Sequence, residues 1–161
     1  MRWTTDLIGV LARLVVGGVW VVAGLIKLPD PAGNVRSVRA YQLLPESVVP
    51  VVGHALPVVE LLVGACLLLG VLTRLFAVVS GLMLTAFVIG IASVWARGLS
   101  IECGCFGGGG GFAGDPRPAY AREIARDVGL VLLSGWLVLR PRTRVALDNV
   151  LLPQPPHPAA S

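Results

Sequence analysis

The sequence carries little charge for its length: 13 Lys and Arg and 9 Asp and Glu among 161 residues, 14% in all. A soluble domain of this size needs a larger polar fraction to cover its surface. Hydrophobic residues make up 55% of the chain, and long apolar runs recur along nearly its whole length. These runs predict an integral membrane protein whose surroundings are mostly lipid.

Other features that are scarce or absent exclude further classes of protein. Three cysteines are too few for a disulfide-stapled scaffold. Despite the net charge of +4, no basic helix and no basic stripe interleaved with aromatic residues is present, so no nucleic-acid partner is expected. Strand-length alternation is also absent, and lipid cannot satisfy free backbone groups, which leaves helices as the spanning form. The predicted fold class is all-α.

Four apolar runs are each close to the roughly 20 residues that cross a bilayer. They predict an integral membrane four-helix bundle over residues 1–144. The first run is too long for a signal peptide and is closed by no small-x-small cleavage site, so we expect it to be retained. The proline-rich segment 145–161 predicts a disordered tail. The expected spans are 7–28, 48–72, 75–95 and 121–139.

The orientation of such a bundle in the membrane is judged from where its basic residues lie. Four spans place both termini and the turn at Arg74 on one side of the membrane. Five arginines lie on each side, so the count alone does not decide. The dense "RPRTR" cluster at 140–144 and the minimal turn favour cytoplasmic termini. The loop at 98–118 then faces the oxidising, extracytoplasmic side.

This loop contains the motif "ECGCFG", in which Cys103 and Cys105 flank Gly104. A disulfide between them closes a very small ring, and Gly104 tolerates the backbone angles that the ring needs. Such a ring is easily reduced and cross-links nothing distant, which favours a transferable disulfide over a structural one. The glycine run 107–111 gives the loop freedom to meet a partner's sulfur, although it would equally serve as a linker.

Two alternatives to redox exchange stay open for the cysteines: a metal site and a pair of inert thiols. A metal site needs further ligands, and neither His54 nor His157 lies in the loop, so no metal is expected. Two inert reduced thiols are the other alternative, but redox exchange is favoured. The third cysteine, Cys66, lies too deep to resolve the pair and is expected to pack as a small apolar residue.

Charged residues within the apolar runs are costly in lipid and usually face the interior of a bundle. With a rise of about 1.5 Å per residue, Glu60 lies about 18 Å in from the cysteine side, and Arg13 about 9 Å in from the other side. In a core about 30 Å thick these depths nearly coincide. Arg13 and Glu60 are therefore predicted as a buried pair, which would either take part in chemistry or only orient the helices.

Further charges lie toward the cysteine side. They are Lys27 and the neighbouring residues Arg126 and Asp127. The cations Lys27 and Arg126, together with Arg97, would lower the pKa of a loop thiol and stabilise a thiolate. Glu102 would oppose this effect. The alternative is that these side chains only extend their charged ends to the membrane surface.

Several fragments, taken in order, resemble one known family. They are "AGLIKLPDP", "YQLLP", "LPVVEL", "RGLSIECGCFG" and "ARD". This pattern, over about residues 7–139, is similar to the methylamine-utilisation MauE family, a branch of the broader DoxX-like integral membrane proteins. "ECGCFG" between the third and fourth spans is its most specific element.

The resemblance implies a four-helix membrane bundle, broadly like the DsbB and vitamin K epoxide reductase types, in a bacterial inner membrane. Founding members are needed, with a thioredoxin-like partner, for maturation of the disulfide-rich methylamine dehydrogenase. Relatives are thought to serve extracytoplasmic thioredoxin-like or DsbA-like proteins. By this resemblance Cys103 and Cys105 carry the redox role, with Lys27, Glu60 and Arg126 as supporting polar residues. The glycine run departs from the family and leaves the partner open.

The leading interpretation is a membrane thiol–disulfide oxidoreductase for an extracytoplasmic thioredoxin-fold protein. With only one cysteine pair in the loop, electrons need another carrier, and a quinone bound near Lys27 and Arg126 is a candidate. The rival is a non-catalytic membrane scaffold that docks a maturation factor. A third candidate is a subunit of a quinol-oxidising complex, although the lack of paired histidines argues against haem in this chain.

Overall fold

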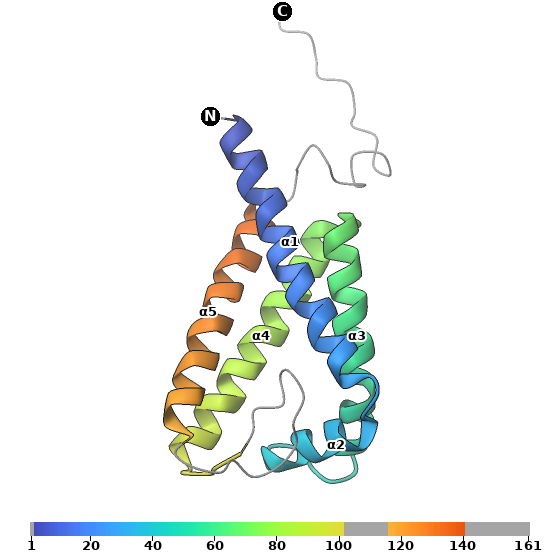
Figure 1. The fold of residues 1–161 in the computed structure, drawn as a ribbon, viewed down its shortest axis with the longest axis vertical. Helices are drawn as coiled ribbons and strands as arrows, with labels where there is room; N and C mark the ends of the chain where they lie inside the picture. The colour runs from blue at the N-terminus through green and yellow to red at the C-terminus, as the bar shows by residue number, and fades with distance from the viewer. Residues whose placement is uncertain (1, 102–115, 141–161) are drawn as a thin grey trace, which may run out of the picture.

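Five α-helices make up the part of the chain that the computed structural model describes, residues 2–101 and 116–140 (Figure 1). No β-strand occurs within those two ranges, and the predicted all-α fold class is confirmed. The Cys-Gly-Cys motif, the glycine run and the proline-rich tail lie outside the described residues. The helices are α1 (Arg2–Lys27), α2 (Pro31–Ala40), α3 (Val49–Leu69), α4 (Thr73–Ala96) and α5 (Arg117–Leu139).

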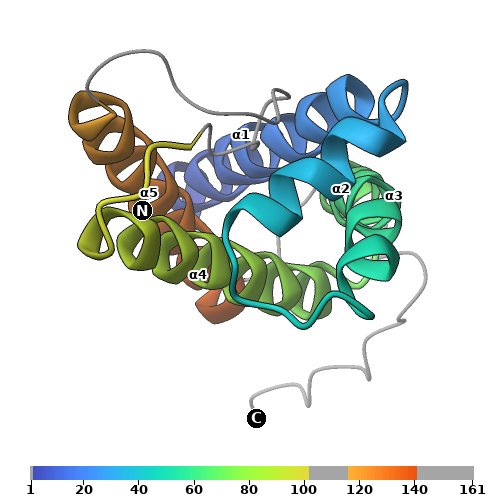
Figure 2. The same cartoon turned by 90° about the horizontal axis from the view of Figure 1, so that it is seen from below.

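The four long helices pack as two pairs. α1 lies along α3 and α4 lies along α5, and these two pairs make the most extensive contacts between elements (Figure 1). The short helix α2 lies across one end of the long helices (Figure 2). The C-terminus of α4 and the N-terminus of α5 lie at that same end, which we call the α2 end (Figure 1).

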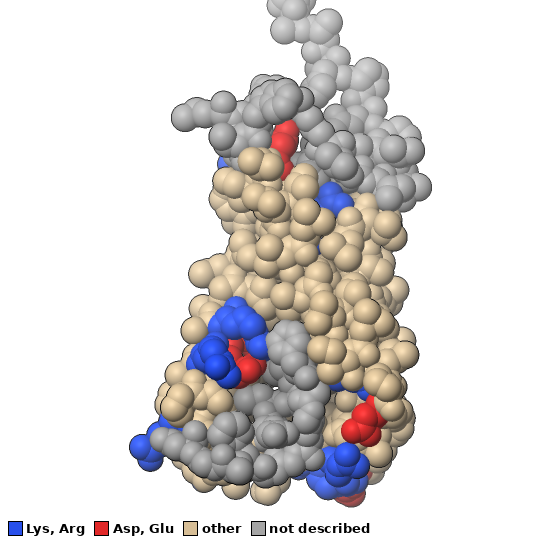
Figure 3. Space-filling model, in the orientation of Figure 1, with Lys and Arg blue, Asp and Glu red and all other residues tan. Residues whose placement is uncertain are grey.

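The distribution of side chains is that of a protein in lipid. Three segments are long and apolar enough to cross a bilayer: 6–27 of α1, all of α3 and all of α4. Large apolar side chains such as Leu82 point outward, whereas Glu60 and Asp127 are buried. Figure 3 shows a band without charge across the middle of the visible face, with charged side chains above and below it. The chain is a multi-pass membrane protein.

The predicted fourth span coincides with α5, which is long enough at 23 residues but less apolar than the other three. Its charges all fall in its first half, and its second half is a continuous apolar run interrupted only by Ser134 and glycines. Whether α5 crosses the bilayer therefore depends on which way those charges face. Its charged residues are Arg117, Arg122, Glu123, Arg126 and Asp127.

Helix α2 forms between the first two predicted spans. Asp30 caps it, because its Oδ1 accepts a hydrogen bond of 2.8 Å from the backbone N–H of Gly33, and Pro31 occupies the first turn. In the last turn of α2, exposed Arg39 makes an ion pair with Glu46, which lies between α2 and α3. The hydrogen bond from Arg39 lowers the pKa of Glu46, and its charge acts in the same direction.

Two close glycine contacts set the register of α1 against α3. Gly17 lies against Gly64 and Leu68, and Gly24 lies against Leu61 and the carbonyl of Pro57. Missing side chains at these glycines let the two backbones approach closely. Arg13, one turn before Gly17, therefore lies level with the end of α3.

The predicted pair of Arg13 with Glu60 is wrong for this reason. Arg13 instead caps the C-terminus of α3: its Nε donates to the Leu67 carbonyl at 2.9 Å and its Nη2 to the Leu68 carbonyl at 3.0 Å. The depth estimate took Leu7 as the membrane boundary, but α1 starts at Arg2 and extends past the end of α3. Glu60 lies more than two turns away from this end and pairs with Lys27.

Candidate functional site

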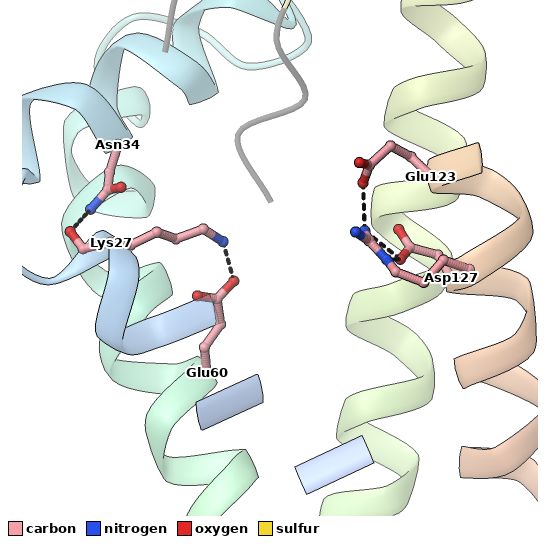
Figure 4. Close-up of polar contacts among 6 residues, drawn as sticks. Lys27, Asn34, Glu60, Glu123 and Asp127 are labelled. Carbon is pink, nitrogen blue, oxygen red and sulfur yellow. Dashed lines mark hydrogen bonds and ion pairs between the residues drawn. The ribbon is translucent and has the colours of Figure 1, made fainter. Parts of the chain in front are cut away.

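A buried ion pair joins the C-terminus of α1 to the middle of α3. The Nζ of Lys27 lies 2.5 Å from Oε1 of Glu60, and the two side chains are 2% and 0% exposed (Figure 4). The Lys27 ammonium also lies 5.7 Å from the centre of the Phe87 ring on α4. At the end of α1, Asn34 of α2 donates a hydrogen bond of 2.8 Å to the Lys27 carbonyl. Three helices therefore fix the position of this lysine.

A second charged group lies on α5. The Arg126 guanidinium bonds Oδ1 of Asp127 through Nε at 2.9 Å and Nη2 at 2.8 Å. Its Nη2 also lies 2.6 Å from Oε2 of Glu123, one turn earlier. The single guanidinium of Arg126 thus forms ion pairs with two carboxylates. In Figure 4 the two charged groups extend toward each other from opposite sides of the interior.

A small cavity borders both charged groups. Glu60, Arg126 and Asp127 contribute to its wall, and apolar side chains of α1, α4 and α5, including Phe87, complete it. Its volume is about 20 Å³, enough for one water molecule. We call it the inner cavity.

A larger cavity lies on the other side of the Lys27–Glu60 pair, beneath α2. It has a volume of about 230 Å³ and is lined by residues of α2, the end of α1, α3 and α4. Its wall is mostly apolar, and among the described residues that line it the buried Lys27 is the one charged group. Phe87 lines both this cavity and the inner cavity. We call it the α2 cavity. Its other polar wall residues are Asn34, Ser37 and Tyr41.

The chain that leads into the cysteine loop is anchored next to the α2 cavity. The hydroxyl of buried Tyr120 on α5 accepts the Ile101 N–H at 2.9 Å and lies 2.9 Å from the Leu99 carbonyl. Ile101 and Tyr120 belong to a small apolar cluster against which Tyr41 packs, and Tyr41 also lines the α2 cavity. Arg97 donates to the Tyr41 carbonyl and ties α4 to α2. Residue 101, two positions before Cys103, is thereby fixed at the α2 end.

Most of the predicted polar residues meet in this region. Lys27 and Glu60 form one group, and Arg126 and Asp127 belong to the other. Exposed Arg97 lies apart from both and bonds backbone carbonyls. Cys66 is a free, partly buried thiol in α3. The three predicted residues that lie outside the described part of the chain are Glu102, Cys103 and Cys105.

Several residues of the region were not predicted. The i, i+3 spacing of Glu123 and Arg126 was a readable sign of their ion pair. The capping sequence "DPAG" signalled the helix that presents Asn34 and leads to Tyr41. No pattern in the sequence indicated that Tyr120 would hold the start of the loop, because that contact joins residues 19 positions apart.

The described residues contain no group of three or more His, Cys, Asp or Glu side chains placed to hold a metal ion. The sites that they do form are an apolar cavity with one buried ammonium and a water-sized cavity between charged groups. A mostly apolar cavity with one buried cation suits a mostly apolar ligand that carries a polar group.

Comparison with known proteins yields one match. No curated protein and no solved structure matches the chain significantly. The family model described as methylamine utilisation protein MauE matches residues 5–140. This range includes all five helices except the first three residues of α1, as well as the cysteine loop, and the chain belongs to the MauE family.

Proposed function

We propose that this protein is a membrane thiol–disulfide redox protein, in which Cys103 and Cys105 exchange a disulfide with an extracytoplasmic thioredoxin-like or DsbA-like partner. The family description supports a role in methylamine utilisation, where the exchange would serve the maturation of a disulfide-rich protein. The observation that carries the proposal is the anchoring of Ile101 by Tyr120. It fixes the approach to Cys103 beside a cavity with a buried ammonium.

The exchange balances in two steps. A thiolate of the reduced partner attacks the Cys103–Cys105 disulfide and forms a mixed disulfide, releasing one thiolate of the pair. The partner's second thiolate then attacks the mixed disulfide, which leaves the partner oxidised and both Cys103 and Cys105 reduced. Two electrons have moved to the loop, and they must leave before the next cycle.

The α2 cavity fits the ring of a membrane quinone, which accepts two electrons and two protons. Its volume of about 230 Å³ is below the range of about 300–1,000 Å³ for drug-sized ligands, so it would hold a ring while the tail stays in lipid. Lys27 would donate a hydrogen bond to a ring oxygen, and the apolar wall would exclude water. Arg126, the other residue expected near a quinone, lines the inner cavity instead.

In the arrangement that we propose, α5 is the fourth span of a four-helix bundle in a bacterial inner membrane, with both termini in the cytoplasm. Arg126 and Asp127 engage each other on the inner side of α5, whereas Leu132 and Leu139 point outward and are 70% and 78% exposed. Apolar side chains would thus face lipid, and the costly charges would be shielded.

The test is the redox state and side of the loop cysteines in intact cells. In a Cys66→Ser background, cells are alkylated with a membrane-impermeant maleimide, with and without prior mild reduction, and the mass shift is read. Labelling at both cysteines only after reduction is expected, because the resting pair is an extracytoplasmic disulfide. Labelling only by a permeant reagent would overturn the topology and the partner with it.

A scaffold and an oxidoreductase differ in what the cysteines do. The double substitution Cys103→Ser and Cys105→Ser should abolish oxidation of the partner, and so should Cys105→Ser alone, because a single thiol cannot form the disulfide that the partner attacks. Full maturation of the client by the double variant would instead favour a scaffold that docks a maturation factor.

A further inference from the structure

The charges around the inner cavity do not balance. The described residues bring together three carboxyl groups, of Glu60, Glu123 and Asp127, and two cations, Lys27 and Arg126. α4 adds apolar side chains to the cavity wall and no charge. With every group ionised, this cluster would hold one uncompensated negative charge inside the protein, which is strongly unfavourable in a low-dielectric interior.

The excess charge falls on the α5 group. Glu60 has an ammonium of its own in Lys27, whereas Glu123 and Asp127 share the single guanidinium of Arg126. The Glu123 side chain is 19% exposed and that of Asp127 is 2% exposed. Solvent therefore helps Glu123 to stay ionised and gives Asp127 almost no help.

The hydrogen bonds of Asp127 leave one oxygen for a further partner. Its Oδ1 accepts both bonds from Arg126, while its buried Oδ2 has no hydrogen-bond partner among the described residues. Oε2 of Glu60, on the far wall of the same cavity, is also buried and without a partner there. The cavity between has room for one water molecule, and a water needs two to four polar partners.

We propose that the inner cavity is a proton-binding site: Asp127 carries a proton on Oδ2 and donates it in a hydrogen bond to a water molecule in the cavity. This arrangement removes the uncompensated charge and satisfies the unpartnered oxygen in one step. The ligands of the site are thus a proton and a water molecule, held between α3 and α5.

The use of this proton rests on the proposed function. Oxidation of Cys103 and Cys105 to a disulfide releases two electrons and two protons, and a quinone bound in the α2 cavity would supply the acceptor for both. Glu60 lines the inner cavity, Lys27 lines the α2 cavity, and the two are hydrogen bonded. Asp127 would therefore deliver its proton through the water and this pair to the wall of the α2 cavity, and it would regain one of the protons that the thiols release.

The test is infrared spectroscopy of the purified full-length protein at neutral pH, with no substrate added. We expect the carbonyl-stretching band of one protonated carboxyl, which shifts when aspartate is labelled with carbon-13 in its side-chain carboxyl and does not shift when glutamate is so labelled. No variant is needed for this measurement, so misfolding cannot confuse it. Absence of the band, or a shift with labelled glutamate only, would overturn the proposal.

Variants locate the proton independently. The charge-conserving Asp127→Glu should move the band, and the matched Glu123→Asp should leave it in place. Glu123→Gln should abolish the band although Asp127 is retained, because the cluster then has two carboxylates for two cations. A band that moves with Glu123→Asp and not with Asp127→Glu would contradict the assignment. The double variant Cys103→Ser and Cys105→Ser should keep the band, which separates this site from the proposed exchange reaction.

Discussion

At the scale of single residues, the Lys27–Glu60 pair is the strongest constraint on the interior. Both side chains are almost completely buried, so both have lost their hydration, and each is tolerated only because the other neutralises it. The Phe87 ring on α4 provides a further favourable contact for the ammonium. The pair therefore links α1 to α3 and helps to place α4 beside them.

Removing one member of this pair should be far more harmful than removing both. Lys27→Met leaves the Glu60 carboxylate buried without its partner, and we expect a loss of about 3–5 kcal/mol in the free energy of unfolding in detergent. The double variant with Glu60→Met should recover much of that loss, because no buried charge remains. The matched control is Arg36→Met, whose ion pair with Asp30 is exposed and should contribute about 0–1 kcal/mol. Equal effects of Lys27→Met and Arg36→Met would contradict this view.

The sequence alone identified which charges matter but not how they pair. Lys27, Glu60, Arg126 and Asp127 could be recognised because a charge inside an apolar run is rarely without a partner. The choice of partner depends on helix register, which is set by contacts between residues far apart in the chain. For this reason Arg13 was assigned to Glu60, although the structure places it on the carbonyls at the end of α3.

At the scale of helices, the register of α1 against α3 depends on glycines that have no room for a side chain. A Cβ added at Gly64 would lie 2.8 Å from the Gly17 carbonyl oxygen and 2.8 Å from the Val21 backbone nitrogen. Backbone atoms of a helix cannot move aside as a flexible side chain can. By contrast, a Cβ at Gly18 would meet nothing within 4 Å.

Gly64→Ala should therefore push α1 and α3 apart and destabilise the protein by about 1–3 kcal/mol, the usual range for an overpacked interior. Gly18→Ala is the matched control, and we expect it to be neutral or slightly stabilising, because alanine is the better helix former. Thermal unfolding of both variants in the same detergent gives the comparison. If the two melt together, close packing at Gly64 does not set the register.

The helices themselves were predictable to different degrees. Long apolar runs predicted α1, α3 and α4 as spans because composition alone reports them. α2 was missed because it is short and polar, and its capping by Asp30 is a local signal that a search for membrane spans does not weigh. The position of α5 was predicted, but its average hydropathy is lowered by its charged residues. Only the structure reveals that Asp127 is buried and that Glu123 and Arg126 are partly buried around it.

At the scale of the whole molecule, the fold gathers everything of chemical interest at the α2 end. The α2 cavity, the buried lysine and the anchored approach to the cysteine loop all lie there, whereas the opposite end holds the tight α3–α4 turn. The described residues thus bring the α2 cavity and the start of the cysteine loop to one end of the molecule. This arrangement requires the α2 end to face the extracytoplasmic side if the partner is extracytoplasmic.

Four single-cysteine variants test that topology together with the crossing of α5. Each is placed in a background that lacks Cys66, Cys103 and Cys105. Ser47→Cys and Ser100→Cys lie at the α2 end and are exposed, so an impermeant maleimide should label them in intact cells. Arg74→Cys and Arg140→Cys lie at the other end and should react only after permeabilisation.

Because Ser100 and Arg140 are separated along the chain by α5, labelling of both from outside would show that α5 does not cross the bilayer. Labelling of Arg74→Cys but not Ser47→Cys would instead show a bundle inserted the other way, with the cysteine loop in the cytoplasm.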